Sequence, residues 1–101
     1  MMSKCRITVI KRMLNEDLAN AYCKRPEICS VFTDNQTFMV DSPQKPLGFC
    51  DGAWDCISHY VFAFLHGGGD FYTGWMKDEN TMIACCNDGV RPVVFKLERV
   101  D

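Results

Sequence analysis

The chain has 101 residues, of which 48% are hydrophobic and 24% charged. This length allows one domain, and the composition is typical of a folded globular chain rather than a disordered one. The formal net charge is −2 and the longest apolar run covers only residues 60–65, so we expect neither a nucleic acid nor a membrane as a partner.

Cysteine is the unusual feature of the composition, with seven copies in so short a chain. The first residues show no apolar core of a signal peptide, so we expect the protein to stay in the cytoplasm with its thiols reduced. The odd count and the irregular spacing also disfavour a disulfide framework. Each cysteine is therefore expected to be either a small core residue or a functional thiolate.

The first half of the chain predicts two strands and a short helix. A run rich in β-branched residues, from Cys5 to Met13, predicts the first strand. Asn15 and the acidic residues after it predict the start of a helix, which should end with basic residues just before Pro26. Residues 37–40 predict a second strand, closed by a turn over residues 41–43.

The second half predicts a longer helix and a hairpin. Apolar residues at helical spacing predict an amphipathic helix over residues 53–66, with Gly67 as its stop. Residues 67–80 predict an apolar loop. Strands over residues 81–86 and 90–100 flank a turn that contains Gly89, which predicts a C-terminal β-hairpin. The predicted fold is α+β, in the order β-α-β-α-β-β, a small sheet with two helices on one face.

Several blocks of the sequence resemble a known family. They are CSVF (residues 29–32), KPLGFCDGAW (45–54), GWMKD (74–78) and IACCNDGVRPVVFKLERV (83–100). Together they resemble short cysteine-bearing proteins, frequent in anaerobic bacteria and archaea, whose function is uncharacterised. The resemblance implies a cytoplasmic protein of an anaerobe, and it assigns no catalytic residue.

The predicted topology brings three cysteines together. A helix that precedes a strand and packs on it usually runs antiparallel to that strand, so the start of helix 53–66 should lie near the end of strand 81–86. Cys50 would then be a neighbour of Cys85 and Cys86. Only one of that pair can face Cys50, because adjacent strand residues point to opposite faces. A helix N-terminus favours a thiolate, which makes Cys50 the best candidate for a reactive or ligating sulfur.

Other residues around this predicted site have two interpretations. Asp51 and Asp88 are candidates for orienting a ligand, or are plain N-cap and turn residues. Trp54 is a candidate wall of a ligand pocket, or part of the core. The place of Cys29 stays open. The remaining cysteines are interpreted as incidental: Cys5, Cys23 and Cys56.

Three functions compete on these observations. The first is a thiolate-based binding or redox module, in which Cys50, Cys85 and Cys86 hold a soft metal such as Zn or Fe, a cluster, or a small thiol-reactive ligand. The second is a small enzyme with Cys50 as nucleophile, activated by the helix dipole and a nearby acid or histidine. The third is a non-catalytic homodimeric interaction module whose thiols only pack.

Overall fold

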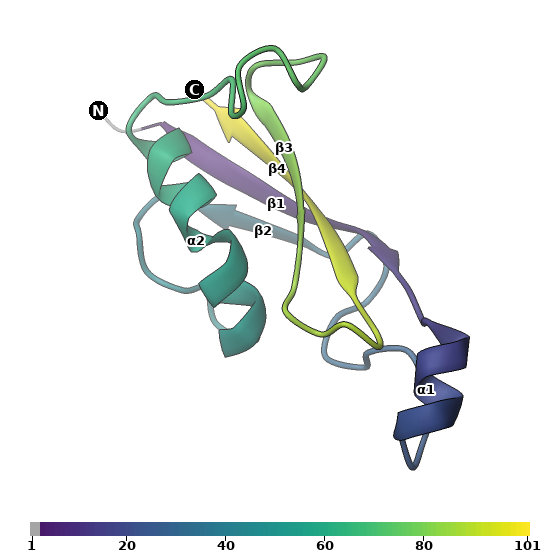
Figure 1. Cartoon of the computed structure of the whole chain (residues 1–101). Coiled ribbons are helices and arrows are strands. Elements are labelled where there is room, and N and C mark those ends of the chain that lie inside the picture. Colours follow the sequence, from purple (N-terminus) through teal and green to yellow (C-terminus); the bar gives the residue numbers. More distant parts are fainter. Residues whose placement is uncertain (1–2) are drawn as a thin grey trace.

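A computed structural model describes residues 3–101. Its elements are β1 (Lys4–Arg12), α1 (Glu16–Tyr22), β2 (Thr37–Val40), α2 (Asp51–Leu65), β3 (Thr81–Cys85) and β4 (Val93–Val100). The strands form one antiparallel sheet in the order β2-β1-β4-β3 (Figure 1). The predicted α+β class, the order of the elements and the C-terminal hairpin of β3 and β4 are confirmed. Among the described residues, no helix combines the length and the apolar character that crossing a membrane requires.

The core lies on one face of this sheet. Alternate side chains of the two central strands, β1 and β4, point to that face and are fully buried: Cys5, Ile7, Val9, Val93, Phe95 and Leu97. The opposite face carries cross-strand ion pairs, such as Arg6 with Glu98 at 3.3 Å. One buried and one polar face is the usual arrangement of an antiparallel sheet that is covered on one side.

Helix α2 covers the core face. Its buried stripe consists of Ala53, Ile57, Val61, Phe64 and Leu65, and the helix packs on β1, β3 and β4. The helix ends as predicted at Gly67, whose φ of 84° is in the left-handed region that glycine tolerates. The N–H of Gly68 then donates to the carbonyl of Ala63 at 2.8 Å, which closes the last turn.

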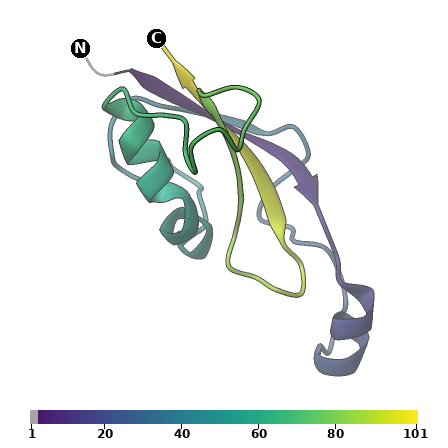
Figure 2. The same ribbon diagram turned by 45° about the horizontal axis from the view of Figure 1, so that its top comes forward.

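Helix α1 lies elsewhere than expected. It extends beyond the end of the sheet instead of covering a face (Figures 1 and 2). Ala19 is its only buried residue, so the helix has almost no apolar stripe with which to pack. Polar bonds hold its start to the β3–β4 turn: the Asn15 N–H donates to the Val90 carbonyl at 2.8 Å, and the Asn15 side chain donates to the Gly89 carbonyl.

Candidate functional site

The start of α2 lies against the segment that follows β3, as the sequence predicts. A Cβ atom on Gly52 would stand 2.5 Å from the side-chain oxygen of Asn87, so a larger residue here would push the Asn87 side chain aside. The helix and the strand run in opposite directions (Figure 1). Cys50, just before α2, and Cys86, just after β3, therefore lie at the same end of the core.

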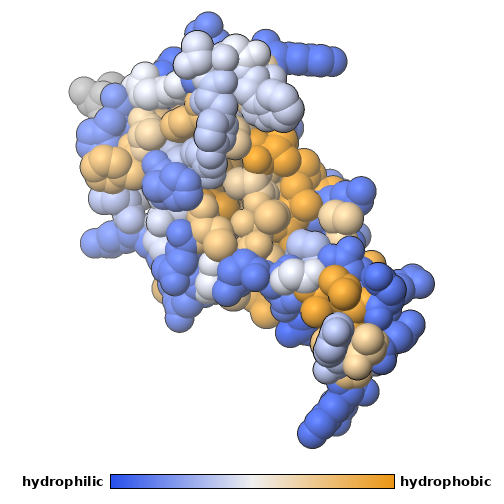
Figure 3. Space-filling model, viewed as in Figure 1, coloured by the Kyte–Doolittle hydropathy of each residue, from blue (hydrophilic) through white to orange (hydrophobic). Residues whose placement is uncertain are grey.

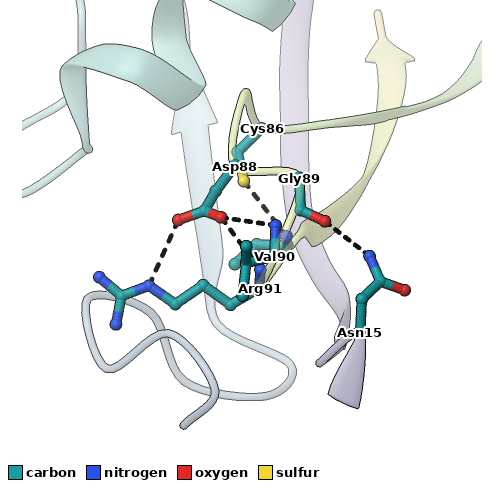
Figure 4. A network of polar contacts seen from close by, with 7 residues as sticks. Asn15, Cys86, Asp88, Gly89, Val90 and Arg91 are labelled. Carbon is teal, nitrogen blue, oxygen red and sulfur yellow. Dashed lines mark hydrogen bonds and ion pairs between the residues drawn. The ribbon is translucent and has the colours of Figure 1, made fainter. Parts of the chain in front are cut away.

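The two adjacent cysteines at the end of β3 point to opposite faces. Cys86 packs against the core, on the same side as Met82 and Ala84, whereas Cys85 and Ile83 are exposed on the outer face. Cys86 is also fixed to the other strand of the hairpin. Its Sγ accepts a hydrogen bond from the Val93 N–H at 3.3 Å (Figure 4). Its own N–H donates to the Val93 carbonyl at 3.0 Å.

Cys56 lies in the second turn of α2. It is partly buried against the core. Burial raises the pKa of Cys56, and the charges of Cys85, Cys86 and Asp55 raise it further. Cys56 follows Gly52, which approaches Asn87, by four residues, so it lies on the side of α2 that faces the end of β3. Figure 3 shows apolar side chains gathered on the surface alongside α2, over β3.

The sequence analysis missed Cys56 and treated it as incidental. The reason was its spacing of six residues from Cys50, which does not place two residues on the same side of a helix. The spacing of Cys56 from the buried residues of the helix would have indicated its place. Cys56 follows the buried Ala53 by three residues and precedes the partly buried Tyr60 by four. It therefore lies along one border of the buried stripe, where a helix meets a neighbouring element.

Cys50 is the N-cap residue of α2, and its side chain makes no capping hydrogen bond. It packs partly buried against the core. Asp51, for which an N-cap role was one interpretation, is instead the first residue of the helix. Its carboxylate is exposed and pairs with Lys45, so Asp51 points toward solvent rather than toward the thiols.

The expected three-thiolate metal centre is not formed. Within residues 3–101, no three His, Cys, Asp or Glu side chains are gathered in a way that could hold a metal ion. A structural zinc site takes about four such ligands. Cys50, Cys85 and Cys86 share one end of the fold, but the outward direction of Cys85 separates it from the other two.

Trp54 and Cys29 have other neighbours in the fold. Trp54 packs on Phe49, with ring centroids 5.8 Å apart, and it borders a shallow cavity of about 410 Å³ that includes Pro43 and Phe62. Two residues along a helix correspond to a rotation of about 200°, so Trp54 and Cys56 lie on different flanks. Cys29 lies beside Arg12, which donates to the Cys29 carbonyl at 3.0 Å.

Asp88 organises the turn between β3 and β4. Its Oδ1 accepts hydrogen bonds from the N–H groups of Val90 (2.8 Å) and Arg91 (3.0 Å), and its Oδ2 pairs with Arg91 Nε at 3.4 Å (Figure 4). These bonds, above all the one from the Arg91 N–H, lower the pKa of Asp88. The Asp88 carboxylate therefore stabilises the β3–β4 turn, which was one of the two interpretations of this residue from the sequence.

We expect Asp88→Asn to lower the free energy of unfolding by about 1 kcal/mol at neutral pH, because it weakens these hydrogen bonds. The pKa of Asp88 is lower in the folded state than its ordinary value of 3.8, so its contribution is present above that value and is lost as the pH falls below it. Urea unfolding should show a difference in the free energy of unfolding between the two proteins at neutral pH, and this difference should disappear in acid. The same comparison with Asp41→Asn, on an exposed carboxylate, should show no such pH-dependent difference, and a difference for Asp88 that persists in acid would contradict the prediction.

Comparisons of the chain with models of known protein families, with curated proteins and with solved structures found no match. The resemblance to cysteine-bearing proteins of anaerobes therefore stays a prediction.

Proposed function

We propose that this chain is a small dithiol module, in which the sulfurs of Cys56 and Cys86 alternate between free thiols and a disulfide. The observation that carries the proposal is the contact of Gly52 with Asn87, which joins the start of α2 to the end of β3. Cys56 lies about one helical turn beyond Gly52 and Cys86 directly precedes Asn87, so this contact supports a short distance between the two sulfurs. The proposal keeps the redox module expected from the sequence and moves its centre from Cys50 to Cys56.

The reaction needs a disulfide as its partner. The Cys86 thiolate attacks one sulfur of a low-molecular-weight disulfide, and the other half of that molecule leaves as a thiol. Cys56 then gives up its proton and attacks the sulfur of Cys86, which releases the second half as another thiol. Two protein thiols are oxidised to one disulfide, and one small disulfide is reduced to two thiols.

The surroundings of Cys56 favour the disulfide form. Burial and the nearby Cys85 and Cys86 charges raise the pKa of the Cys56 thiol, so the reduced pair gains little from ionisation. Stabilised thiolates are what make a dithiol couple strongly oxidising. A pair without that stabilisation holds its disulfide more firmly and acts as a reductant of other disulfides.

Cys56 is a better partner for Cys86 than the adjacent Cys85. Neighbouring Cα atoms stand about 3.8 Å apart, whereas disulfides usually join Cα atoms about 4.4–6.8 Å apart. Cys85 also points to the outer face and is exposed, whereas Cys86 packs on the core side. A bond between the two would need the end of β3 to distort.

The alternative of a Cys50 nucleophile lacks a positioned base. Asp51 is paired with Lys45. The nearest histidine in the sequence, His59, lies nine residues further along the same helix, which is about 13 Å at the rise of an α-helix. A general base has to stand within hydrogen-bonding reach of the group that it activates.

The test is anaerobic oxidation of the reduced protein with mixtures of oxidised and reduced glutathione, followed by proteolysis and mass spectrometry. We expect a Cys56–Cys86 disulfide as the main intramolecular product. Both Cys56→Ser and Cys86→Ser should stop the reaction at a mixed disulfide with glutathione. Cys85→Ser should leave the intramolecular bond intact.

Cys29→Ser is the matched control, because Cys29 is also partly buried against the core but lies beside Arg12. It should not change the yield of the disulfide. The proposal is overturned if Cys56→Ser still forms an intramolecular disulfide with Cys86 at the original rate, or if the dominant bond joins Cys50 or Cys85 to Cys86.

A further inference from the structure

A cleft lies outside the dithiol, between the segment after α1 and the β3–β4 turn. Its volume is about 450 Å³, within the range of small-molecule sites. One wall comes from residues 23–27 and the other from residues 88–91. Figures 1 and 2 show α1 and the turn standing beside each other at this end of the molecule.

An arginine stands on each wall of this cleft, namely Arg25 and Arg91. Arg91 Nε donates a hydrogen bond to Asp88 Oδ2 at 3.4 Å, which holds the Arg91 side chain in place (Figure 4). Asp88 also accepts hydrogen bonds from the N–H groups of Val90 and Arg91, which hold its carboxylate at the turn. The two terminal nitrogens of Arg91 point away from Asp88 (Figure 4), and the planar guanidinium is well suited to a carboxylate.

Two more residues of the cleft narrow the class of ligand. Cys23 lines it with an exposed thiol, which is the group that exchanges with a disulfide. Glu27 adds an acid on the same wall, a partner for an ammonium group. The walls are completed by the apolar Pro26 and Val90. The cleft therefore offers two guanidinium groups for carboxylates, the acid Glu27 for an amine, and a thiol, while its second acid, Asp88, is engaged by Arg91 and the turn.

We infer that this cleft binds a small amino-acid-like disulfide through its carboxylates, and that Cys23 exchanges with it. The Cys23 thiolate attacks one sulfur of the ligand and the S–S bond of the ligand breaks. One half stays on Cys23 as a mixed disulfide, and the other half leaves and takes up a proton as a thiol. The inference goes beyond the proposed function, because neither Cys56 nor Cys86 takes part in this step.

The test compares two disulfides on the Cys56→Ser/Cys86→Ser protein, so that failure of the dithiol proposal cannot affect the result. Oxidised glutathione carries carboxylates and amines, whereas bis(2-hydroxyethyl) disulfide carries neither. The rate of mixed-disulfide formation at Cys23 is divided by the rate at the exposed Cys85 in the same sample. We expect this ratio to be about fivefold higher with oxidised glutathione, as surface ion pairs allow.

Arg25→Gln and Arg91→Gln should each reduce that preference, and the double variant should abolish it. Lys24→Gln removes the same charge beside the cleft but not from its lining, so it should keep the preference. Salt at about 0.5 M should weaken the effect, because it screens exposed charges. Equal ratios for the two reagents, or a preference that survives in the double arginine variant, would overturn the inference.

Discussion

Replacement of Phe49 by alanine is expected to lower the free energy of unfolding by about 3–5 kcal/mol, the usual cost of removing a buried aromatic side chain. Phe49 is only 3% exposed although it lies in a loop. Its ring makes edge or tilted contacts, at centroid distances of 4.9–5.8 Å, with Phe32, Phe38, Trp54 and Phe95. The side chain thus fastens the start of α2 to the sheet.

Leu47 provides a matched control for this experiment. It stands two residues before Phe49 in the same loop and is 98% exposed. Leu47→Ala should therefore change the free energy of unfolding by less than about 0.5 kcal/mol. Urea unfolding followed by circular dichroism measures both variants. Equal losses for the two would contradict the role of Phe49.

Phe49 also matters to the thiols, because it immediately precedes Cys50, the N-cap residue of α2. Loosening the start of the helix moves Cys56 relative to Cys86. Under conditions in which Phe49→Ala remains folded, glutathione should therefore form the Cys56–Cys86 disulfide more slowly than in the original chain. If the dithiol proposal holds, one substitution thus lowers both the free energy of unfolding and the rate of disulfide formation.

The sequence was most informative where the hydrophobic pattern was strong. The two central strands alternate buried and exposed residues, and α2 repeats its apolar residues at helical spacing, so both kinds of element could be predicted. The antiparallel relation of α2 to β3 followed from topology, and with it the approach of Cys50 and Cys86 to one end of the fold.

The sequence was least informative where the position depends on tertiary contacts. Helix α1 begins with residues typical of a helix N-terminus but has almost no apolar stripe. Its local sequence therefore could not predict which part of the fold it contacts. Its real anchors are hydrogen bonds from Asn15 to the turn between β3 and β4. The cleft with Arg25 and Arg91 exists only because of that placement, and no local pattern could have predicted it.

The choice of thiols shows the same limit. The sequence indicates that Cys85 and Cys86 point to opposite faces, but both faces of that strand are apolar, so the pattern could not tell which one is covered. Burial of Met82 and exposure of Ile83 in the folded chain decide that Cys86 faces α2. The proposed pairing with Cys56 rests on the approach of Gly52, four residues earlier in α2, to Asn87.

Cys5 is expected to be inert in the folded protein, in contrast to the exposed thiols. It is fully buried in β1, and burial raises the pKa of Cys5 to about 12, from an ordinary value of 9.0. Since the thiolate is the reactive form, its alkylation at slightly alkaline pH should be about a thousandfold slower than that of Cys23 or Cys85. Iodoacetamide labelling with peptide mapping measures all three rates in one sample.

The same thiol makes stability depend on alkaline pH. Because the folded pKa of Cys5 lies above the unfolded value of 9.0, its contribution to stability is complete below that pH and is lost as the pH rises toward 12. The free energy of unfolding of the original chain should therefore fall relative to that of Cys5→Ala across this interval. By contrast, the difference in free energy of unfolding between the original chain and Cys23→Ala, which removes an exposed thiol, should stay constant across the same interval. Labelling of native Cys5 as fast as that of Cys85 would show that the β1 thiol is accessible, and the alkaline loss of stability would then need another cause.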